Sequence, residues 1–190
     1  MAMPAMLIVI GGLPGTGKSS LASALARVLD AIYLRVDTIE QAIGDATGHP
    51  HAVGAAGYVV AYALAEENVR LGRIVVADGV NPVLQTRVAW KSVAERASVP
   101  LFDVELICSD PIEHRRRVEQ RRAGTRGTGL PTWSDVLTMT YEPRAGDGLV
   151  PARPEACVAL IPAKGFGLRD SSPMGGHAHR AGCCSRPAHC

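Results

Sequence analysis

The sequence predicts a single α/β domain with a mostly parallel sheet, and three observations support that fold class. The chain has 190 residues, which is within the size of one ordinary domain. Hydrophobic residues make up 47% of it and charged residues 20%, so an apolar core can form. Short β-branched runs also alternate with longer segments of helical periodicity, an order typical of β-α-β units. We therefore expect three layers, with helices flanking a five-stranded sheet.

Strands are expected where short apolar runs end at turn-forming residues. The first run, 6–10, is continuous and ends at Gly11 and Gly12, as expected of a strand that is buried on both faces. Three later runs have the same character: 31–36, 73–78 and 101–108. A fifth strand is expected at either 148–150 or 156–161, and the pattern does not choose between them.

Helices are expected between these strands. Leucines and alanines recur at helical spacing over 18–29, and few helix-breaking residues interrupt 53–71 before Gly72. Asn81 followed by Pro82 is a start signal, because Asn caps helix N-termini and Pro is favoured in the first turn. This signal and similar ones further along predict helices over 82–97, 111–122 and 132–141.

Charge and composition exclude several classes of protein. The net charge is +2, so no strong overall attraction to nucleic acid or to a membrane surface is expected. No apolar run approaches the roughly 18–20 residues that cross a bilayer, and no basic residue precedes the first run as in a secretory signal peptide. We therefore expect no membrane partner and a cytoplasmic location. Three of the five cysteines fall within 183–190, unlike a disulfide framework, so reduced thiols are expected.

The segment 12–19 matches the phosphate-binding pattern G-x-x-x-x-G-K-[ST], between a predicted strand and a predicted helix. In such a loop the glycines let successive N–H groups point at phosphate oxygens, beside the positive end of the helix dipole. Lys18 is expected to reach the β- and γ-phosphates, and the Ser19 hydroxyl to bind Mg²⁺. The motif predicts purine-nucleotide binding by Gly12, Leu13, Pro14, Gly15, Thr16, Gly17, Lys18, Ser19 and Ser20.

Hallmarks of several other nucleoside triphosphatases are missing from the sequence. It has no Asn-Lys pair, and the base-reading motif of GTPases needs one. AAA+ ATPases, helicases and transport ATPases need a longer chain and an acidic pair after the Walker B strand, whereas Gly79 and Val80 follow Asp78. A compact kinase is the class that remains.

Residues 6–143 resemble the P-loop small-molecule kinases of the nucleoside-monophosphate-kinase-like superfamily. Similar members are chloramphenicol phosphotransferase, zeta toxin, polynucleotide-kinase-like proteins and AAA-type ATP-binding kinase-like proteins. Besides the highly specific motif at 12–19, three weaker motifs carry the resemblance in the expected order: Val-Asp-Thr-Ile at 36–39, Ala-Asp-Gly at 77–79 and Arg-Val-Glu-Gln-Arg-Arg at 117–122. The resemblance implies a P-loop NTPase fold with ATP and Mg²⁺ as cofactors.

The resemblance also implies roles for two carboxylates at the carboxyl edge of the sheet, where open parallel sheets bind ligands. At the position of Asp37, the resembling kinases have a carboxylate that binds the acceptor hydroxyl and acts as the base, which requires hydrogen-bond reach of that hydroxyl. The alternative is an N-cap for a helix starting near Thr38. Asp78 is expected either to hold Mg²⁺ through water, together with Ser19, or to contact the substrate. The alternative is a turn residue before Gly79.

A basic segment follows the fourth predicted strand. Residues 114–126 contain six arginines and one acidic residue, a net charge of +5. Arg117 and Arg121 are four residues apart and share a helix face, so this pair can point at phosphates. The resembling kinases carry such arginines on a lid, here at about 115–142, that neutralises the transferring phosphoryl group; Arg122 is expected to bind nucleotide. A solvated basic face and a nucleic-acid-binding patch are the alternatives, and no interleaved aromatic residues support the latter.

Composition divides the chain near residue 164. The only Ile, Leu or Val after it is Leu168, so we expect a P-loop kinase-like domain over 1–164 and a disordered tail over 165–190. The resembling kinases end in a full last strand, whereas here Val150 runs into Pro151. Our hypothesis is that the sequence after about 150 is degenerate or is translated in an altered frame.

Together these features predict an ATP- and Mg²⁺-dependent phosphotransferase that acts on a hydroxyl of a small molecule. Its catalytic residues are expected to be Lys18, Asp37, Arg117 and Arg121, and its metal ligands Ser19 and Asp78. The alternatives are a polynucleotide or nucleotide-sugar kinase, and a nucleotide-binding regulator or degenerate kinase without transfer activity. The sequence names neither the acceptor nor the oligomeric state.

Overall fold

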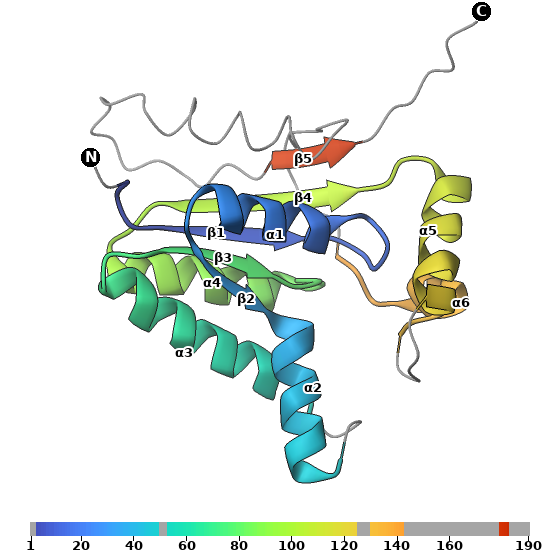
Figure 1. Cartoon of the computed structure of the whole chain (residues 1–190), viewed down its shortest axis with the longest axis horizontal. Helices are drawn as coiled ribbons and strands as arrows, with labels where there is room; N and C mark the ends of the chain where they lie inside the picture. Colours follow the sequence, from blue (N-terminus) through green and yellow to red (C-terminus); the bar gives the residue numbers. More distant parts are fainter. Residues whose placement is uncertain (1–2, 50–52, 125–129, 143–178, 183–190) are drawn as a thin grey trace, which may run out of the picture.

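A parallel sheet forms the middle layer of the molecule (Figure 1). The computed structural model describes residues 3–49, 53–124, 130–142 and 179–182. The strands are β1 (Met6–Gly11), β2 (Ile32–Arg35), β3 (Ile74–Asp78), β4 (Leu101–Ile107) and β5 (His179–Gly182). They are ordered β2-β3-β1-β4-β5, and every neighbouring pair is parallel. The predicted α/β class with a parallel sheet is therefore confirmed.

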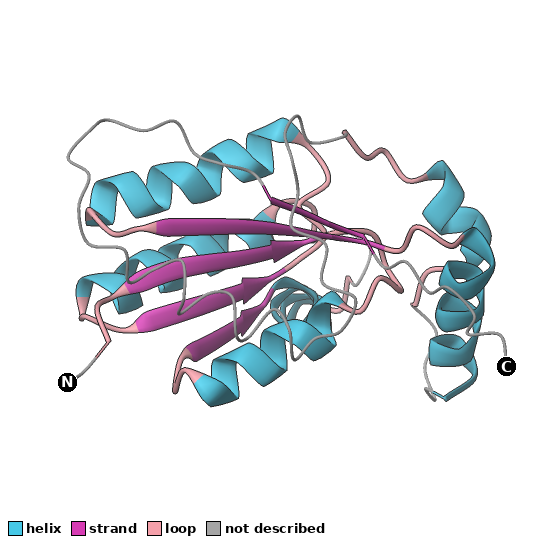
Figure 2. Ribbon diagram, turned by 90° about the horizontal axis from the view of Figure 1, so that it is seen from above, coloured by secondary structure: helices cyan, strands magenta, loops and turns pink. Residues whose placement is uncertain are grey.

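Helices cover both faces of the sheet, which Figure 2 shows from above. They are α1 (Lys18–Val28), α2 (Val36–Thr47), α3 (Ala56–Arg70), α4 (Leu84–Ala97), α5 (Pro111–Gly124) and α6 (Trp133–Thr138). Strands and helices alternate from β1 to α5, apart from the helix pair α2 and α3, as the alternating sequence pattern predicts.

The strand beyond β4 is His179–Gly182, which pairs with β4 in parallel. These residues belong to the segment 165–190, for which the sequence predicted disorder. The two candidate strands, 148–150 and 156–161, lie outside the described residues, as does the rest of that segment. The boundary at 164 therefore stays a prediction.

The core consists of two apolar clusters, one on each face of the sheet. Leu7 and Val9 of β1 pack with α3 and α4 on one face, where Trp90 is also buried. Ile8 and Ile10 pack with α1 on the other face. Successive strand residues point to opposite faces, so a central strand covered on both sides needs a continuous apolar run. Burying each such side chain contributes about 1.5–3 kcal/mol.

Capping residues begin the last two helices where the sequence predicts. Asp110 Oδ1 accepts hydrogen bonds from the backbone N–H groups of Ile112 at 2.9 Å and Glu113 at 3.3 Å, at the start of α5. Thr132 and Asp135 form a reciprocal capping box at α6. Polar side chains thus satisfy N–H groups that have no intrahelical partner.

The predicted cap at Asn81 is wrong, because α4 begins at Leu84, two residues later than predicted, with Val83 in the cap position. Asn81 is instead 1% exposed and has a left-handed backbone with φ of 51°. Its Oδ1 accepts a hydrogen bond of 2.9 Å from Trp90 Nε1, and its backbone N–H donates to the Tyr58 hydroxyl at 2.9 Å. A buried indole N–H needs an acceptor, and this need draws the asparagine into the core.

The chain after α6 returns to the start of α4. The backbone N–H of Glu142 donates to the Pro82 carbonyl at 2.8 Å, and Arg87 donates to the Glu142 carbonyl at 2.8 Å. The Glu142 carboxylate also lies 3.6 Å from Arg87. Arg87 therefore attaches the segment after α6 to α4.

The carboxyl ends of β1, β2 and β3 meet at one edge of the sheet, and α5 and α6 lie beyond the strand ends (Figure 1). In the register, Ile10 and Arg35 both pair with Asp78. This edge is where open parallel sheets bind ligands.

Candidate functional site

Residues 12–17 form a tight loop between β1 and α1. Thr16 Oγ1 donates a hydrogen bond of 2.9 Å to the Leu13 carbonyl, and Lys18 Nζ donates one of 3.3 Å to the same oxygen. Gly12 has φ of +137°, and a Cβ atom there would collide with the Leu106 carbonyl of β4. The close approach of β4 therefore requires glycine at this position.

Helix α5 packs directly on this loop. Gly15 has φ of +86°, and a Cβ atom there would lie 2.5 Å from Val118 Cγ2. His114 Nε2 lies 2.7 Å from the Pro14 carbonyl oxygen, and the His114 side chain is buried. The His114 ring also meets Trp133 edge to face, with centroids 5.2 Å apart. Helix α5 thus contacts the loop directly, and α6 contacts the His114 ring of α5.

A cavity of about 310 Å³ opens where α1 begins, at the lower end of the roughly 300–1,000 Å³ of small-molecule sites. It is lined by Gly15, Gly17, Lys18, Ser19, Ser20, Arg35, Arg117 and Arg121. Four of these side chains are cationic, and the helix N-terminus adds a favourable dipole for anions. The cavity is therefore suited to a polyanionic ligand.

Lys18 is 4% exposed, so its ammonium group is almost completely removed from solvent. Burial lowers the pKa of Lys18, while the charges of Asp78 and Asp37 act in the opposite direction. Among the described residues, its side chain has one hydrogen bond, to the Leu13 carbonyl, and no carboxylate oxygen within 4.0 Å. An ammonium group has three N–H donors, so Lys18 retains donors for an anion.

Asp78 ends β3 and is 1% exposed. Its Oδ2 accepts a hydrogen bond of 2.8 Å from the Tyr33 hydroxyl and lies 3.8 Å from Arg35 Nε. Its Oδ1 is buried without a hydrogen-bond partner in the described part of the chain. Burial and the Asp78 charge raise the pKa of Tyr33, which keeps the hydroxyl a donor. One carboxylate oxygen is thus held and the other is left for a cation or a donor.

Asp37 lies in the first turn of α2, and its predicted alternative role as an N-cap is wrong. The helix begins at Val36, so Arg35 occupies the cap position, and no side-chain cap bond is present there. Asp37 Oδ2 instead lies 3.0 Å from Arg35 Nη2 and 3.9 Å from Arg121 Nη2. The Asp37 carboxylate is 41% exposed, and the two arginines that it contacts both line the cavity.

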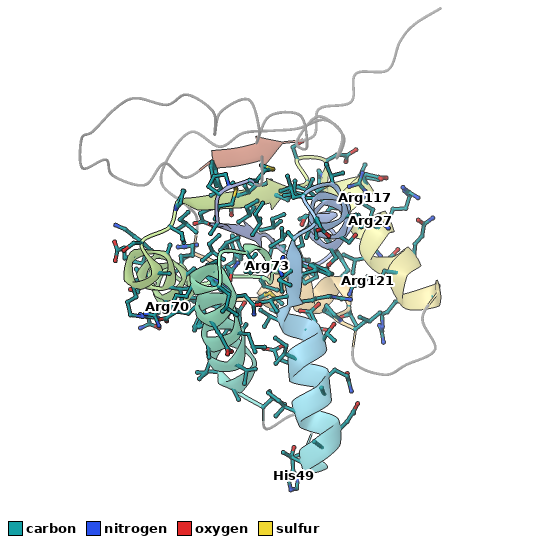
Figure 3. All side chains as sticks on the ribbon, turned by 60° about the vertical axis from the view of Figure 1, so that its left-hand side comes forward. Arg27, His49, Arg70, Arg73, Arg117 and Arg121 are labelled. Carbon is teal, nitrogen blue, oxygen red and sulfur yellow. The ribbon has the colours of Figure 1, made fainter. Side chains whose placement is uncertain are left out.

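Arg117 and Arg121 lie on one face of α5 and both line the cavity, as their spacing predicts. Figure 3 shows them on the side of α5 that faces the rest of the molecule. Arg122 is exposed and is not among the residues that line the cavity. Glu113, one residue before the basic segment 114–126, pairs with Arg117 at 2.7 Å and with Arg116 at 2.6 Å. It therefore offsets part of the positive charge expected for this helix.

Sequence reasoning missed four residues of this site: Tyr33, Arg35, Glu113 and His114. The spacing of Glu113 from Arg116 and Arg117, three and four residues, is a helical pairing signal that could have found it. Arg35 lies two residues before Asp37 and directly precedes a helix, a weaker signal. No local pattern points to Tyr33 or His114, because their partners lie 45 and 100 residues away.

His49 lies at the far end of α2, away from α5, and is exposed (Figure 3).

Within the described ranges, no helix is long and apolar enough to span a membrane. The same ranges contain no group of three or more His, Cys, Asp and Glu side chains that could hold a metal.

Solved structures with the same fold include three kinases or candidate kinases. A candidate kinase from Chloroflexus aurantiacus has 20% identity and a TM-score of 0.64, covering 96% of this chain and 86% of that chain. The APS kinase CysC of Mycobacterium tuberculosis, solved with AMPPNP and APS, has 20% identity and a TM-score of 0.61, with coverages of 84% and 96%. A sugar kinase from Janibacter sp. HTCC2649 has 18% identity and a TM-score of 0.53, with coverages of 84% and 94%.

At these identities the similarity shows a shared fold. No curated protein matches this chain. A family model described as an AAA domain, AAA_33, matches residues 7–132, which is about two thirds of the sequence. The match runs from β1 through the phosphate-binding loop to the residue before α6. With its P-loop between a central parallel strand and a helix, the chain belongs to this AAA domain family and has the fold of P-loop kinases.

Proposed function

We propose that this protein transfers the γ-phosphoryl group of ATP, in the presence of Mg²⁺, to a hydroxyl group of a small molecule. The observation that carries the proposal is Lys18: a buried ammonium group with spare donors, at a helix N-terminus, in a cavity that α5 lines with Arg117 and Arg121. A buried cation without a carboxylate partner is costly unless an anion neutralises it. The triphosphate of ATP is such an anion.

The loop would bind the phosphates through its N–H groups and through Lys18. Ser19 lines the cavity, and Asp78 Oδ1, which has no hydrogen-bond partner among the described residues, is the type of oxygen ligand that Mg²⁺ prefers. We therefore assign Ser19 and Asp78 to the metal, directly or through water. Bound Mg²⁺ would neutralise charge on the phosphate oxygens.

Asp37 is proposed as the group that receives the acceptor proton. In the transfer, the acceptor oxygen forms a bond to the γ-phosphorus while the bond from that phosphorus to the β–γ bridging oxygen breaks. The hydroxyl proton moves to the Asp37 carboxylate, and ADP leaves with the bridging electron pair. Arg35, at 3.0 Å, fixes the orientation of this carboxylate.

Arg117 and Arg121 are proposed to stabilise the charge on the phosphoryl oxygens during transfer, because both side chains line the cavity. Arg121 is also 3.9 Å from Asp37, so it contacts both the proposed base and the cavity proposed for the phosphates. Arg122 is not among the residues that line the cavity and is left out of the proposed set.

The test is a transfer assay with γ-labelled ATP and a panel of acceptors that contains small-molecule alcohols, nucleotide sugars and 5′-hydroxyl oligonucleotides. We expect label in a small-molecule alcohol, and we expect Lys18→Ala to abolish it. Lys91→Ala is the matched control, since Lys91 is exposed and pairs with Glu95 on α4. Label in oligonucleotides or nucleotide sugars alone would favour the alternative kinases. ATP binding without consumption across the whole panel would favour a nucleotide-binding regulator.

A further inference from the structure

His114 is buried at the junction between α5 and the phosphate-binding loop. It is 6% exposed, and its Nε2 lies 2.7 Å from the Pro14 carbonyl oxygen, across 100 residues of sequence. A carbonyl oxygen can only accept, so Nε2 must carry the proton of this hydrogen bond. The bond therefore has a fixed direction, from α5 to the loop.

The same helix face carries the arginines of the cavity. Arg117 and Arg121 follow His114 by three and seven residues, and Val118 follows it by four, so all four side chains share one face of α5. Val118 is the residue that a Cβ atom on Gly15 would meet at 2.5 Å. The contacts that hold α5 on the loop and the arginines that line the cavity thus belong to one rigid surface.

The His114 ring also contacts α6, the second helix of this region. The Trp133 ring lies edge to face with it, at a centroid distance of 5.2 Å and an interplanar angle of 79°. Trp133 is the first residue of α6, directly after Thr132 of the capping box. The imidazole is therefore held by two contacts, one with the Trp133 ring of α6 and one with the Pro14 carbonyl of the loop.

We propose that His114 is a positioning residue, whose hydrogen bond to Pro14 sets the height of Arg117 and Arg121 above the phosphate-binding loop. The proposal rests on the proposed function for the identity of the anion, the phosphates of ATP. An α-helix rises about 1.5 Å per residue, so a shift of α5 by one residue along its axis would exceed the tolerance of a hydrogen bond to a phosphate oxygen. One bond near the start of the helix can thus control two side chains further along it.

Two substitutions separate the hydrogen bond from the ring packing. His114→Phe keeps an aromatic ring against Trp133 and removes the donor. His114→Gln removes the ring and keeps an N–H group at a similar reach. Each variant is combined with Arg121→Ala in a double-mutant cycle, because coupling between two residues measures whether one acts through the other. His49→Phe is the matched control, since His49 is exposed at the far end of α2.

The readout is the dissociation constant of ATP with Mg²⁺, measured by calorimetry on the full chain. We expect His114→Phe to weaken binding about tenfold and His114→Gln less than about threefold, in keeping with the loss or retention of one buried hydrogen bond. Arg121→Ala should weaken binding clearly in the wild type and by less than about twofold in the His114→Phe background. His49→Phe should bind as the wild type does.

A second readout needs no nucleotide. Hydrogen exchange of the amides of residues 15–17 should be faster in His114→Phe than in the wild type and unchanged in His49→Phe. If His114→Phe does not fold, His114→Asn, whose amide is too short to reach the Pro14 carbonyl, takes its place in both measurements.

Two results would overturn the proposal. The first is wild-type ATP affinity in His114→Phe. The second is a double variant whose loss of ATP affinity equals the product of the losses in His114→Phe and Arg121→Ala, because the two residues would then act independently. A lowered unfolding temperature with an independent cycle would mean that His114 is merely structural, and would overturn it too. A wild-type protein that binds ATP and transfers no phosphoryl group would contradict the proposed function, while the cycle and the exchange rates would still decide on His114.

Discussion

The Tyr33 hydroxyl donates a hydrogen bond of 2.8 Å to Asp78 Oδ2, between neighbouring strands of the sheet. This bond occupies one oxygen of a fully buried carboxylate and fixes its plane. The other oxygen, Oδ1, is the one without a hydrogen-bond partner in the described part of the chain. Tyr33 therefore determines which oxygen of Asp78 is presented to a ligand.

Tyr33→Phe should raise the Mg²⁺ concentration needed for half-maximal ATP binding about tenfold, since partners that orient a metal ligand commonly affect metal affinity to this extent. Titrating Mg²⁺ at a fixed ATP concentration measures it. Tyr62→Phe is the control, because the Tyr62 hydroxyl donates to the Thr86 carbonyl at 3.2 Å instead of to a carboxylate. An unchanged Mg²⁺ requirement in Tyr33→Phe would remove Asp78 from the proposed metal site.

Asp37→Asn should leave ATP affinity within about threefold and reduce the transfer rate on the order of 10²–10⁴-fold, the usual contribution of a general base. The amide can still accept a hydrogen bond from Arg35, but it cannot take the acceptor proton. Comparing ATP binding with single-turnover transfer separates the two effects. Asp45→Asn, further along α2 and bonded to Gln41, is the control. Transfer at the wild-type rate would leave Asp37 with a role in orienting the arginines alone.

Gly15→Ala should destabilise the fold by about 2–4 kcal/mol, combining the strain of a positive φ with a steric clash. The new methyl group would lie 2.5 Å from Val118 Cγ2, and α5 would have to move away from the loop. Gly48→Ala isolates the strain, because Gly48 also has a positive φ, of 71°, and no described atom lies within 4 Å of the position that its Cβ would occupy. It should cost about 1 kcal/mol. Urea unfolding of both variants measures the difference, and equal losses would contradict the clash.

Sequence reasoning succeeded where the cause is local. Strand β1 is predicted because a strand covered on both faces is continuously apolar, and Asp110 and Thr132 start their helices through bonds to N–H groups two or three residues away. It failed where the partner is remote: Asn81 has the chemistry of a cap, but the indole of Trp90 recruits it into the core. The sequence also does not locate β5, the edge strand that pairs with β4, because an edge strand needs little apolar sequence.

The site follows the same rule. The G-x-x-x-x-G-K-[ST] pattern defines the loop, and helical spacing puts Arg117 and Arg121 on one face. The contacts that place this face against the loop, from His114 to Pro14 and from Val118 to Gly15, depend on how α5 docks and have no signature in either segment.

Glu113 supplies a pH-dependent contribution to the stability of α5. Hydrogen bonds from Arg116, the larger cause, and from Arg117 hold the pKa of Glu113 at about 2, below its ordinary value of 4.5. A carboxylate whose pKa is lower in the folded state stabilises the fold above its unfolded pKa, and this contribution is lost as the pH falls through the folded pKa. Unfolding free energies of the wild type should therefore decline between about pH 4.5 and pH 2.

Glu113→Gln should flatten that part of the pH dependence, as measured by urea unfolding at a series of pH values. Glu119→Gln is the control, because Glu119 pairs with Arg115 on the exposed side of the helix. An identical acid decline in Glu113→Gln and the wild type would show that the pairs with Arg116 and Arg117 do not stabilise the protein in solution.

Asn81→Ala should lower the free energy of unfolding by about 1–3 kcal/mol, because the buried Nε1–H of Trp90 loses its acceptor. Asn68→Ala is the control: Asn68 is half-buried and donates to the Leu64 carbonyl of its own helix in a solvent-exposed hydrogen bond, so a change within about 0.5 kcal/mol is expected. Thermal or urea unfolding measures both. A loss no larger in Asn81→Ala than in Asn68→Ala would contradict the role of the Trp90 hydrogen bond.

The contacts of Glu142 with Arg87 and Pro82 attach the segment 114–142, which contains α6 and most of α5, to the rest of the fold at a second point. His114 holds one end on the phosphate-binding loop, and Glu142 holds the other at α4. The contact that forms first restricts the conformations open to the segment between His114 and Glu142. The second contact then loses less conformational entropy when it forms, so each contact favours the other. The His114 and Glu142 contacts are therefore thermodynamically coupled, although they attach the segment to different elements of the fold.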